Sequence, residues 1–250
     1  MSDVSANPLF YKSVTPLDSQ RHKSLRLGRP DRAFGYASLS NLIPAVVDEF
    51  ELAAPELCIA FLPTPAGASA VFVTGTAPGQ NCFVSDTGNW TGAYVPAYLR
   101  RYPFIIGDIA GSESVLCFDE SYAGFGDPMG QPLFEADGNR TEALAKALAF
   151  SQTYRDAAKR TESFCRMLTD FALLQAATLD ITAADGSRST VHGIEIIDEA
   201  ALAALSGDRL AQLNGAGFLR AIYAQITSLR AISRLTVPAA PAPALEEATN

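Results

Sequence analysis

Short apolar runs alternate with turn residues through the first half of the chain, a pattern typical of β-strands. Residues 57–61 form an apolar run that predicts a buried strand, and residues 70–74 follow it at hairpin distance. A second strand pair is predicted over residues 103–109 and 114–118, with a short helix near residues 48–54. This half is therefore expected to hold an antiparallel or mixed sheet.

The apolar period changes from about two to about 3.6 residues near Asp137-Gly138. Thr141 suits the N-cap of the helix that follows, because its hydroxyl can accept from a free N–H group of the first turn. We expect Thr161 to cap a second helix or to kink one long helix. Residues 179–182 and 192–197 predict a β-hairpin. Three further helices are expected over 198–205, 209–213 and 218–235.

These elements divide the chain into an arm, one domain and a tail. Residues 1–33 are polar and broken by prolines, which predicts an extended arm. Residues 34–236 are expected to form a single α+β domain. Its β-rich N-terminal half (34–138) packs with a mainly helical C-terminal half (139–236) that contains the hairpin. Residues 237–250 are rich in proline and alanine and are expected to be disordered.

The formal net charge of -8 argues against a nucleic-acid-binding protein, which needs clustered Lys and Arg. The basic residues concentrate only between residues 21 and 32, where we interpret them as a solvated loop. No apolar run approaches the roughly 18 residues of a membrane helix, and residues 1–8 lack the features of a secretory signal. We therefore expect a cytoplasmic protein without membrane insertion.

The residues that usually build metal or nucleotide sites are sparse. The four cysteines form no C-x-x-C pair, and the two histidines, His22 and His192, lie in unrelated contexts. No phosphate-binding loop and no G-x-G-x-x-G motif after a strand is present. We expect reduced cysteines, no metal and no cofactor.

One aromatic block stands out. Residues 94–104 read Tyr-Val-Pro-Ala-Tyr-Leu-Arg-Arg-Tyr-Pro-Phe, and Asp119-Glu120 follow at the end of a predicted strand. The block is either the hub of the fold, with an acid paired to Arg100 or Arg101, or a recognition surface. Neighbouring strand residues point to opposite faces, so the two acids are not expected to act as a dyad. The candidate partner- or ligand-binding residues are Tyr94, Tyr98, Arg100, Arg101, Tyr102, Asp119 and Glu120.

The same block closely resembles the signature of the SapC family of bacterial proteins. The resemblance extends over about residues 8–235 through the segments Leu116–Glu120, Gln131–Phe134, Asp137-Gly138, Thr161–Cys165, His192–Ile194, Ile197–Glu199 and Ile222–Ala224. It implies a cytoplasmic accessory of surface-layer or outer-membrane systems, including TonB-dependent uptake, and an association with flavin-dependent halogenase-like proteins. It carries over no catalytic residue.

Three hypotheses for function remain open. The first is a non-enzymatic accessory or binding protein whose partner or small ligand comes from the same gene neighbourhood. The second is an enzyme that acts on a small molecule or peptide alongside a flavin-dependent halogenase-like protein or an oxygenase, with a carboxylate as acid or base. The third is a structural subunit that assembles through the helix over residues 218–235.

Overall fold

A five-stranded antiparallel sheet forms the larger half of the structure, in the strand order β3-β5-β4-β10-β9. This computed structural model describes residues 7–65, 67–107, 114–182, 186 and 188–235. The strands of this sheet are β3 (Leu42–Pro44), β4 (Cys58–Thr64), β5 (Gly67–Val73), β9 (Leu174–Thr182) and β10 (Arg188–Ile197). The β4–β5 and β9–β10 hairpins confirm two predicted strand pairs, and every strand pairing described is antiparallel.

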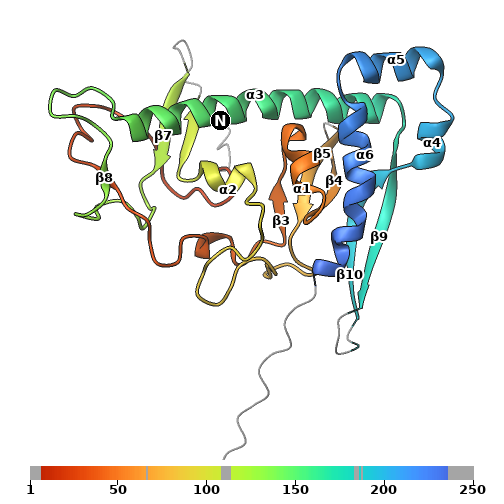
Figure 1. The fold of residues 1–250 in the computed structure, drawn as a ribbon, viewed down its shortest axis with the longest axis horizontal. Helices are drawn as coiled ribbons and strands as arrows, with labels where there is room; N and C mark the ends of the chain where they lie inside the picture. Colours follow the sequence, from red (N-terminus) through yellow and green to blue (C-terminus); the bar gives the residue numbers. More distant parts are fainter. Residues whose placement is uncertain (1–6, 66, 108–113, 183–185, 187, 236–250) are drawn as a thin grey trace, which may run out of the picture.

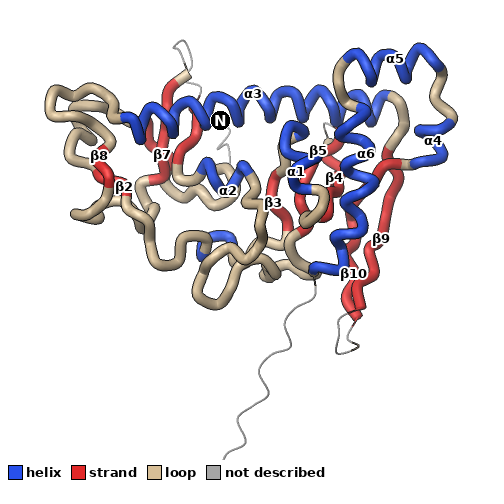
Figure 2. The backbone as a smooth tube through the Cα atoms, viewed as in Figure 1, coloured by secondary structure: helices blue, strands red, loops and turns tan. Residues whose placement is uncertain are grey.

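A smaller half contains two short sheets. β6 (Phe104–Gly107) and β7 (Val115–Asp119) pair as predicted, and β1 (Val14–Pro16) joins the outer side of β7. β2 (Arg26–Leu27) pairs with β8 (Gln131–Pro132). The region predicted as an extended arm thus supplies one strand to each short sheet. Figure 2 shows that loops make up most of the rest of this half.

One uninterrupted helix of 29 residues, α3 (Glu142–Asp170), runs along both halves (Figure 1). Thr141 caps it as predicted, since its hydroxyl accepts from the N–H group of Leu144. Thr161 begins no second helix. Its hydroxyl donates to the Ala157 carbonyl inside α3 and accepts from the N–H group of Val47, so it ties α3 to the segment before α1.

The remaining helices are all shorter than α3. Their order along the chain is η1 (Gly35–Ala37), η2 (Val47–Glu49), α1 (Phe50–Ala53), α2 (Ala97–Arg101), α4 (Glu199–Ala203), α5 (Gly207–Gly215), α6 (Leu219–Ser228) and η3 (Leu229–Arg234). Helices were predicted at α1, α4, α5 and α6, and residues 229–234 of the predicted final helix form the 3-10 helix η3. The antiparallel sheets and the helical C-terminal half confirm the α+β fold class. The predicted tail, 237–250, lies outside the described residues.

Helix α6 completes the larger sheet. Strands β4 and β10 pair only at Glu195 and Phe61. Beyond that point the Gln225 side chain bridges them, because its Nε2 donates to the Ile59 carbonyl and its Oε1 accepts from the Ile197 N–H group. The Ser228 hydroxyl accepts from the N–H group of Ile59. A helix thus supplies hydrogen bonds that a strand ladder would otherwise make.

Two hydrophobic cores follow from this arrangement. The larger core lies around β4, β5, α1, α6 and the second half of α3. The smaller core consists of Phe104, Phe118, Leu133, Phe134 and Leu144, with leucines 17, 25 and 27 packed against it. The halves predicted on either side of residue 138 both contribute to each core, since α3 and the 94–104 block cross between them.

All four cysteines are free thiols, and Cys58, Cys117 and Cys165 are buried. Burial raises the pKa of the Cys58 thiol to about 12 and that of the Cys165 thiol to about 11. None of the described helices is both long enough and apolar enough to span a lipid bilayer.

Candidate functional site

The aromatic block is held in place by a buried carboxylate, Glu49. Its Oε1 accepts from the Val46 N–H group, and its Oε2 accepts from the Ala97 N–H group at 2.7 Å and from the Tyr94 hydroxyl at 2.8 Å. Burial raises the pKa of Glu49, and the hydrogen bonds from Ala97 and Val46 oppose that effect. Glu49 therefore anchors the first residue of α2 to η2.

A second acid, Glu56, holds the chain just before α2. Its two carboxylate oxygens accept from the N–H groups of Ala93 and Tyr94 at 2.9 and 2.7 Å. Neither Glu49 nor Glu56 was predicted to contact the block. The available signal was the position of Glu49 between Val47 and Phe50, where an acid interrupts an otherwise apolar segment.

Arg101 lies inside the protein, so it belongs to the hub. Its guanidinium carbon sits 4.3 Å from the ring centroid of Tyr154, 4.8 Å from that of Tyr98 and 5.6 Å from that of Tyr11. Its side chain is buried, and its Nε has no hydrogen-bond partner among the described residues. Tyr98 is buried with it. Both residues stabilise the fold in this conformation and are closed to a partner.

Asp119 is also fully buried and belongs to the hub. Its carboxylate accepts from the N–H groups of Lys12, Ser13 and Ser121, from the Ser121 hydroxyl and from the Tyr102 hydroxyl. Burial alone would raise the pKa of Asp119, but these hydrogen bonds outweigh it and lower the pKa below its usual value. Asp119 therefore joins the 12–13 segment to the end of β7 as a carboxylate.

The expected pairing of Arg100 or Arg101 with these acids is not formed within the described part of the chain. Asp119 is bound to backbone and hydroxyl groups instead, and Glu120 is exposed beside Ser13, whose hydroxyl lies 3.4 Å from a Glu120 oxygen. The two acids thus occupy different environments, as the alternation of strand side chains predicts.

Arg100 is the exposed member of the arginine pair. Its Nε donates to the Val95 carbonyl at 2.9 Å, and its guanidinium lies over the Phe150 ring of α3 at 5.1 Å and near the Tyr94 ring at 5.7 Å. These contacts fix the direction of the side chain. Its guanidinium forms no ion pair within 4 Å among the described residues, although its charge acts on the carboxylate of Glu49 from a longer distance.

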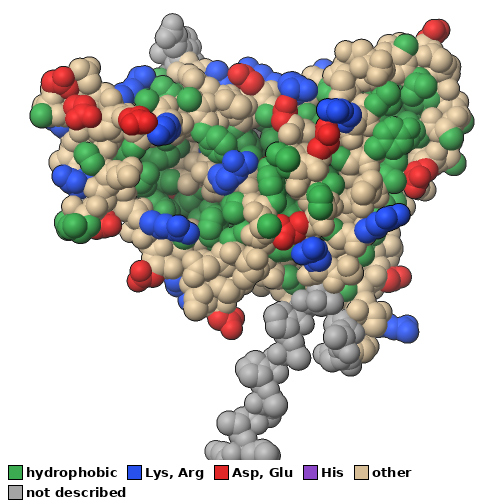
Figure 3. All heavy atoms as spheres, in the orientation of Figure 1, with side chains coloured by type: hydrophobic (Ala, Val, Ile, Leu, Met, Phe, Trp, Pro, Cys, Tyr) green, Lys and Arg blue, Asp and Glu red, His purple; other side chains and the backbone are tan. Residues whose placement is uncertain are grey.

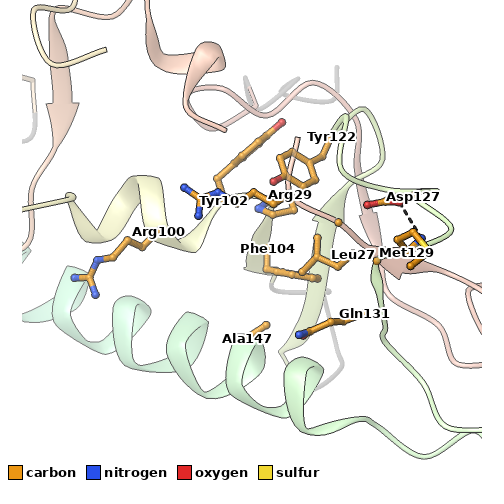
Figure 4. A pocket seen from close by; sticks show the side chains of 13 residues that line it. Leu27, Arg29, Arg100, Tyr102, Phe104, Tyr122, Asp127, Met129, Gln131 and Ala147 are labelled. Atoms are coloured by element: carbon orange, nitrogen blue, oxygen red, sulfur yellow. Dashed lines mark hydrogen bonds between the residues drawn. The ribbon is translucent and has the colours of Figure 1, made fainter. Parts of the chain in front are cut away.

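A cleft with a volume of about 530 Å³ opens between the 94–104 block, α3 and the loops that carry β2 and β8. It is lined by Leu27, Gly28, Arg29, Arg100, Tyr102, Pro103, Phe104, Tyr122, Asp127, Met129, Gly130, Gln131 and Ala147. Figure 3 shows hydrophobic side chains and neighbouring basic side chains in this region below α3. In Figure 4, Arg29 lies beside the rings of Tyr102 and Tyr122, while Arg100 lies apart from them on α2.

The cleft combines positive charge with aromatic and apolar walls. Arg29 is exposed and makes no hydrogen bond or ion pair with another described residue. The rings of Tyr102 and Tyr122 meet edge to face at 5.3 Å. Among the described residues that line the cleft, Asp127 is the single acid, and one of its oxygens accepts from the Met129 N–H group. Such a lining suits a ligand with both an acidic and an apolar group.

Five of the seven predicted binding residues thus do not line the cleft. Arg100 and Tyr102 line it. Tyr94 contacts Arg100 and Asp119 contacts Tyr102, but neither reaches the cleft, and Tyr98, Arg101 and Glu120 lie elsewhere. Arg29 and Tyr122 line the cleft but were not predicted as site residues. Arg29 belongs to the basic segment that was interpreted as a solvated loop, and nothing local in the sequence indicates that this segment folds back beside Tyr102.

The described residues contain no group of three or more His, Cys, Asp or Glu side chains that could hold a metal ion. His22 packs against the Phe118 ring with centroids 5.0 Å apart, and its Nδ1 accepts from the Asp18 N–H group. His192 is exposed on β10. The two histidines therefore contribute nothing to the cleft.

Comparison with models of protein families gives a match to SapC over residues 17–235. No curated protein matches the chain, and no solved structure matches it. The matched range includes both cores and every residue of the cleft.

Proposed function

Because the chain belongs to the SapC family, and because its aromatic block opens onto one arginine-lined cleft, we propose that it is a non-enzymatic accessory protein that binds a partner there. The observation that carries the proposal is the pair of exposed arginines, Arg29 and Arg100, in a cleft walled by Tyr102, Tyr122 and Phe104. Arginine and tyrosine are residue types that dominate binding energy at interfaces.

The lining of the cleft suits an extended segment of a partner protein in which an acidic residue stands next to an aromatic or aliphatic residue. A carboxylate can accept two parallel hydrogen bonds from a guanidinium. The apolar floor formed by Leu27, Phe104 and Ala147 can bury the neighbouring side chain. The open shape of the cleft suits part of a longer chain that continues beyond it. We place this binding in the cytoplasm, beside surface-layer or outer-membrane systems such as TonB-dependent uptake, as the family resemblance implies.

Asp119 is poorly suited to proton transfer, and this argues against the alternative of an enzyme that uses it as general acid or base. Asp119 does not line the cleft, and its oxygens already accept five hydrogen bonds. Its lowered pKa holds it as a carboxylate, whereas a general acid or base works best with a pKa near the working pH. Turnover of a substrate by the purified protein would overturn the non-enzymatic proposal.

The test is capture of the products of neighbouring genes by the purified protein, followed by measurement of the dissociation constant for each captured product. We expect the double variant R29A/R100A to bind about 30-fold more weakly or worse, which corresponds to about 2 kcal/mol lost at a binding hot spot. R166A is the matched control, because Arg166 is exposed on the part of α3 that does not line the cleft.

Both variants should unfold at the wild-type temperature, because the three arginines are exposed. Equal affinity of folded R29A/R100A and wild type for the captured partner would refute the cleft as the binding site. Equal weakening by R166A would show a general charge effect instead.

A further inference from the structure

Strand β9 leaves one long edge of the larger sheet open. It contains nine residues, Leu174–Thr182, and pairs with β10 alone. No backbone group of another described residue bonds to its outer side. A row of backbone N–H and C=O groups therefore faces outward, which is the template that an added strand requires.

The other sheet edges are protected. The edge strands β1, β3 and β8 contain two or three residues each, and each contains a proline: Pro16, Pro44 and Pro132. The edge strand β2 has only two residues, Arg26 and Leu27. The edge strand β6 has four residues and packs against α3. Short strands and prolines are the usual means of blocking edge-to-edge pairing. β9 contains neither proline nor a basic residue, so its edge lacks these means.

The side chains of β9 fit an antiparallel copy of the same strand. Ala177, Leu179 and Ile181 face the larger core. In a register centred on Thr178, Ala177 of one copy lies opposite Leu179 of the second copy, so the apolar row continues across the junction. Asp180, the single charged residue of β9, lies opposite Ala176. No like charges meet, and the carboxylate of Asp180 already accepts from the Thr190 hydroxyl at 3.0 Å.

We propose that β9 pairs antiparallel with β9 of a second copy of this chain, so that two five-stranded sheets become one continuous sheet across a two-fold axis. Such an interface is isologous, because the same strand serves both subunits. The occupant is a second copy because the strand is complementary to itself in charge and in its apolar row. Figure 1 shows β9 and β8 at opposite ends of the molecule, so the dimer leaves the cleft open.

The third hypothesis for function was assembly through the helix over residues 218–235. That helix already packs against other parts of the same chain. In α6, Ala221, Ile222, Ala224 and Gln225 are buried against the sheet. Its apolar face is therefore not available to a partner. Dimerisation through β9 needs no rearrangement of α6.

The test measures molar mass by light scattering over a concentration series for the wild type, T178K and T178E. Thr178 is exposed, so both variants should fold. We expect the wild type to reach the mass of two chains. In each variant, identical charges lie opposite one another across the axis, and this should weaken dimerisation by about fivefold.

Mixing T178K with T178E should restore dimerisation, because opposite charges then meet. H192K is the control, since His192 is exposed on the neighbouring strand and not on the outer edge. A wild type that stays a monomer throughout the series would overturn the proposal. A dimer that T178K and T178E leave unchanged would also overturn it, as would a monomer that binds a strand from a different protein at β9.

Discussion

Arg100 and Arg101 are neighbours in the chain but lie in opposite environments. Arg101 is enclosed by the rings of Tyr11, Tyr98 and Tyr154, whereas Arg100 is exposed at the cleft. The cost of losing each side chain should differ accordingly, because only Arg101 fills space inside the protein.

We therefore predict that R101A lowers the free energy of unfolding by about 3 kcal/mol, through lost cation–π contacts and the cavity left behind. R100A should change it by less than about 0.5 kcal/mol, as for other surface substitutions. Urea denaturation of both variants measures the difference. If R100A proved as destabilising as R101A, the distinction between hub and cleft would be wrong.

The two buried acids should affect stability in opposite ways as the pH changes. The pKa of Asp119 is lowered in the folded state, so its contribution is present above the unfolded value of about 3.9 and is lost as the pH falls through the folded pKa. D119N should lower the free energy of unfolding by about 2 kcal/mol at pH 7, because hydrogen bonds to a charged acceptor are lost. The difference from wild type should shrink below pH ~4, which denaturation across a pH series can measure.

The contribution of Glu49 to stability changes with pH in the opposite direction. Its pKa is raised in the folded state, so the folded protein binds this proton more tightly, and stability rises as the pH falls from above the folded pKa toward about 4.3. E49Q should abolish this rise. It should also destabilise the protein by about 1–3 kcal/mol, because the new amide group faces the N–H group of Val46 or Ala97. If the stability of E49Q rose as much as that of wild type when the pH falls, the rise would come from another titrating group.

Local pattern was enough to predict the elements that depend on neighbours in the chain. The β4–β5 and β9–β10 hairpins follow from alternating apolar runs at short separation, and Thr141 follows from the usual chemistry of an N-cap. The prediction that Thr161 caps a second helix is wrong, because the local sequence does not distinguish a threonine inside a helix from a threonine at an N-cap. Its actual partner, the Val47 N–H group, is 114 positions away in the chain.

The bridge that Gln225 makes between β4 and β10 belongs to the same class of long-range contact. Q225L keeps the volume but leaves the Ile59 carbonyl and the Ile197 N–H group buried without a partner. We predict a loss of about 2–6 kcal/mol in the free energy of unfolding, since each of the two unsatisfied buried groups costs about 1–3 kcal/mol. T227A in the same helix is the control, because Thr227 is exposed and the one bond of its hydroxyl among the described residues is to the Tyr223 carbonyl in the same helix. If Q225L and T227A were equally stable in urea, water would be supplying the hydrogen bonds that the Gln225 amide makes to Ile59 and Ile197.

At the scale of the whole molecule, the cleft could be predicted only in part. Arg100 and Tyr102 were recognised because they lie in the dense aromatic block. Arg29, Tyr122 and Ala147 come from three other segments, and long-range contacts such as the pairing of β2 with β8 and the bond from the Gly28 N–H group to the Gly124 carbonyl bring the first of them beside the block. A two-residue strand has no periodicity to detect, so this part of the site depends on tertiary structure.

The two cores should also differ in stability. The smaller core has five buried hydrophobic residues, and much of its surroundings is loop. Hydrogen exchange should therefore show β6 and β7 amides opening at lower free energy than β4 and β5 amides. L133A, which truncates a fully buried side chain of the smaller core, should widen that gap. Equal acceleration in all four strands would show that the molecule opens as one unit.

The link between Asp119 and the N–H group of Lys12, which are 107 positions apart, has a consequence for biosynthesis. Residues 12–16 leave the ribosome long before β7 is synthesised, so they stay unpaired during that time. The β4–β5 hairpin can already form in the same interval. The smaller core can close only after Leu144 has emerged. A ribosome stalled before that point should carry a protease-sensitive segment at residues 7–33, and one stalled well beyond it a protected segment.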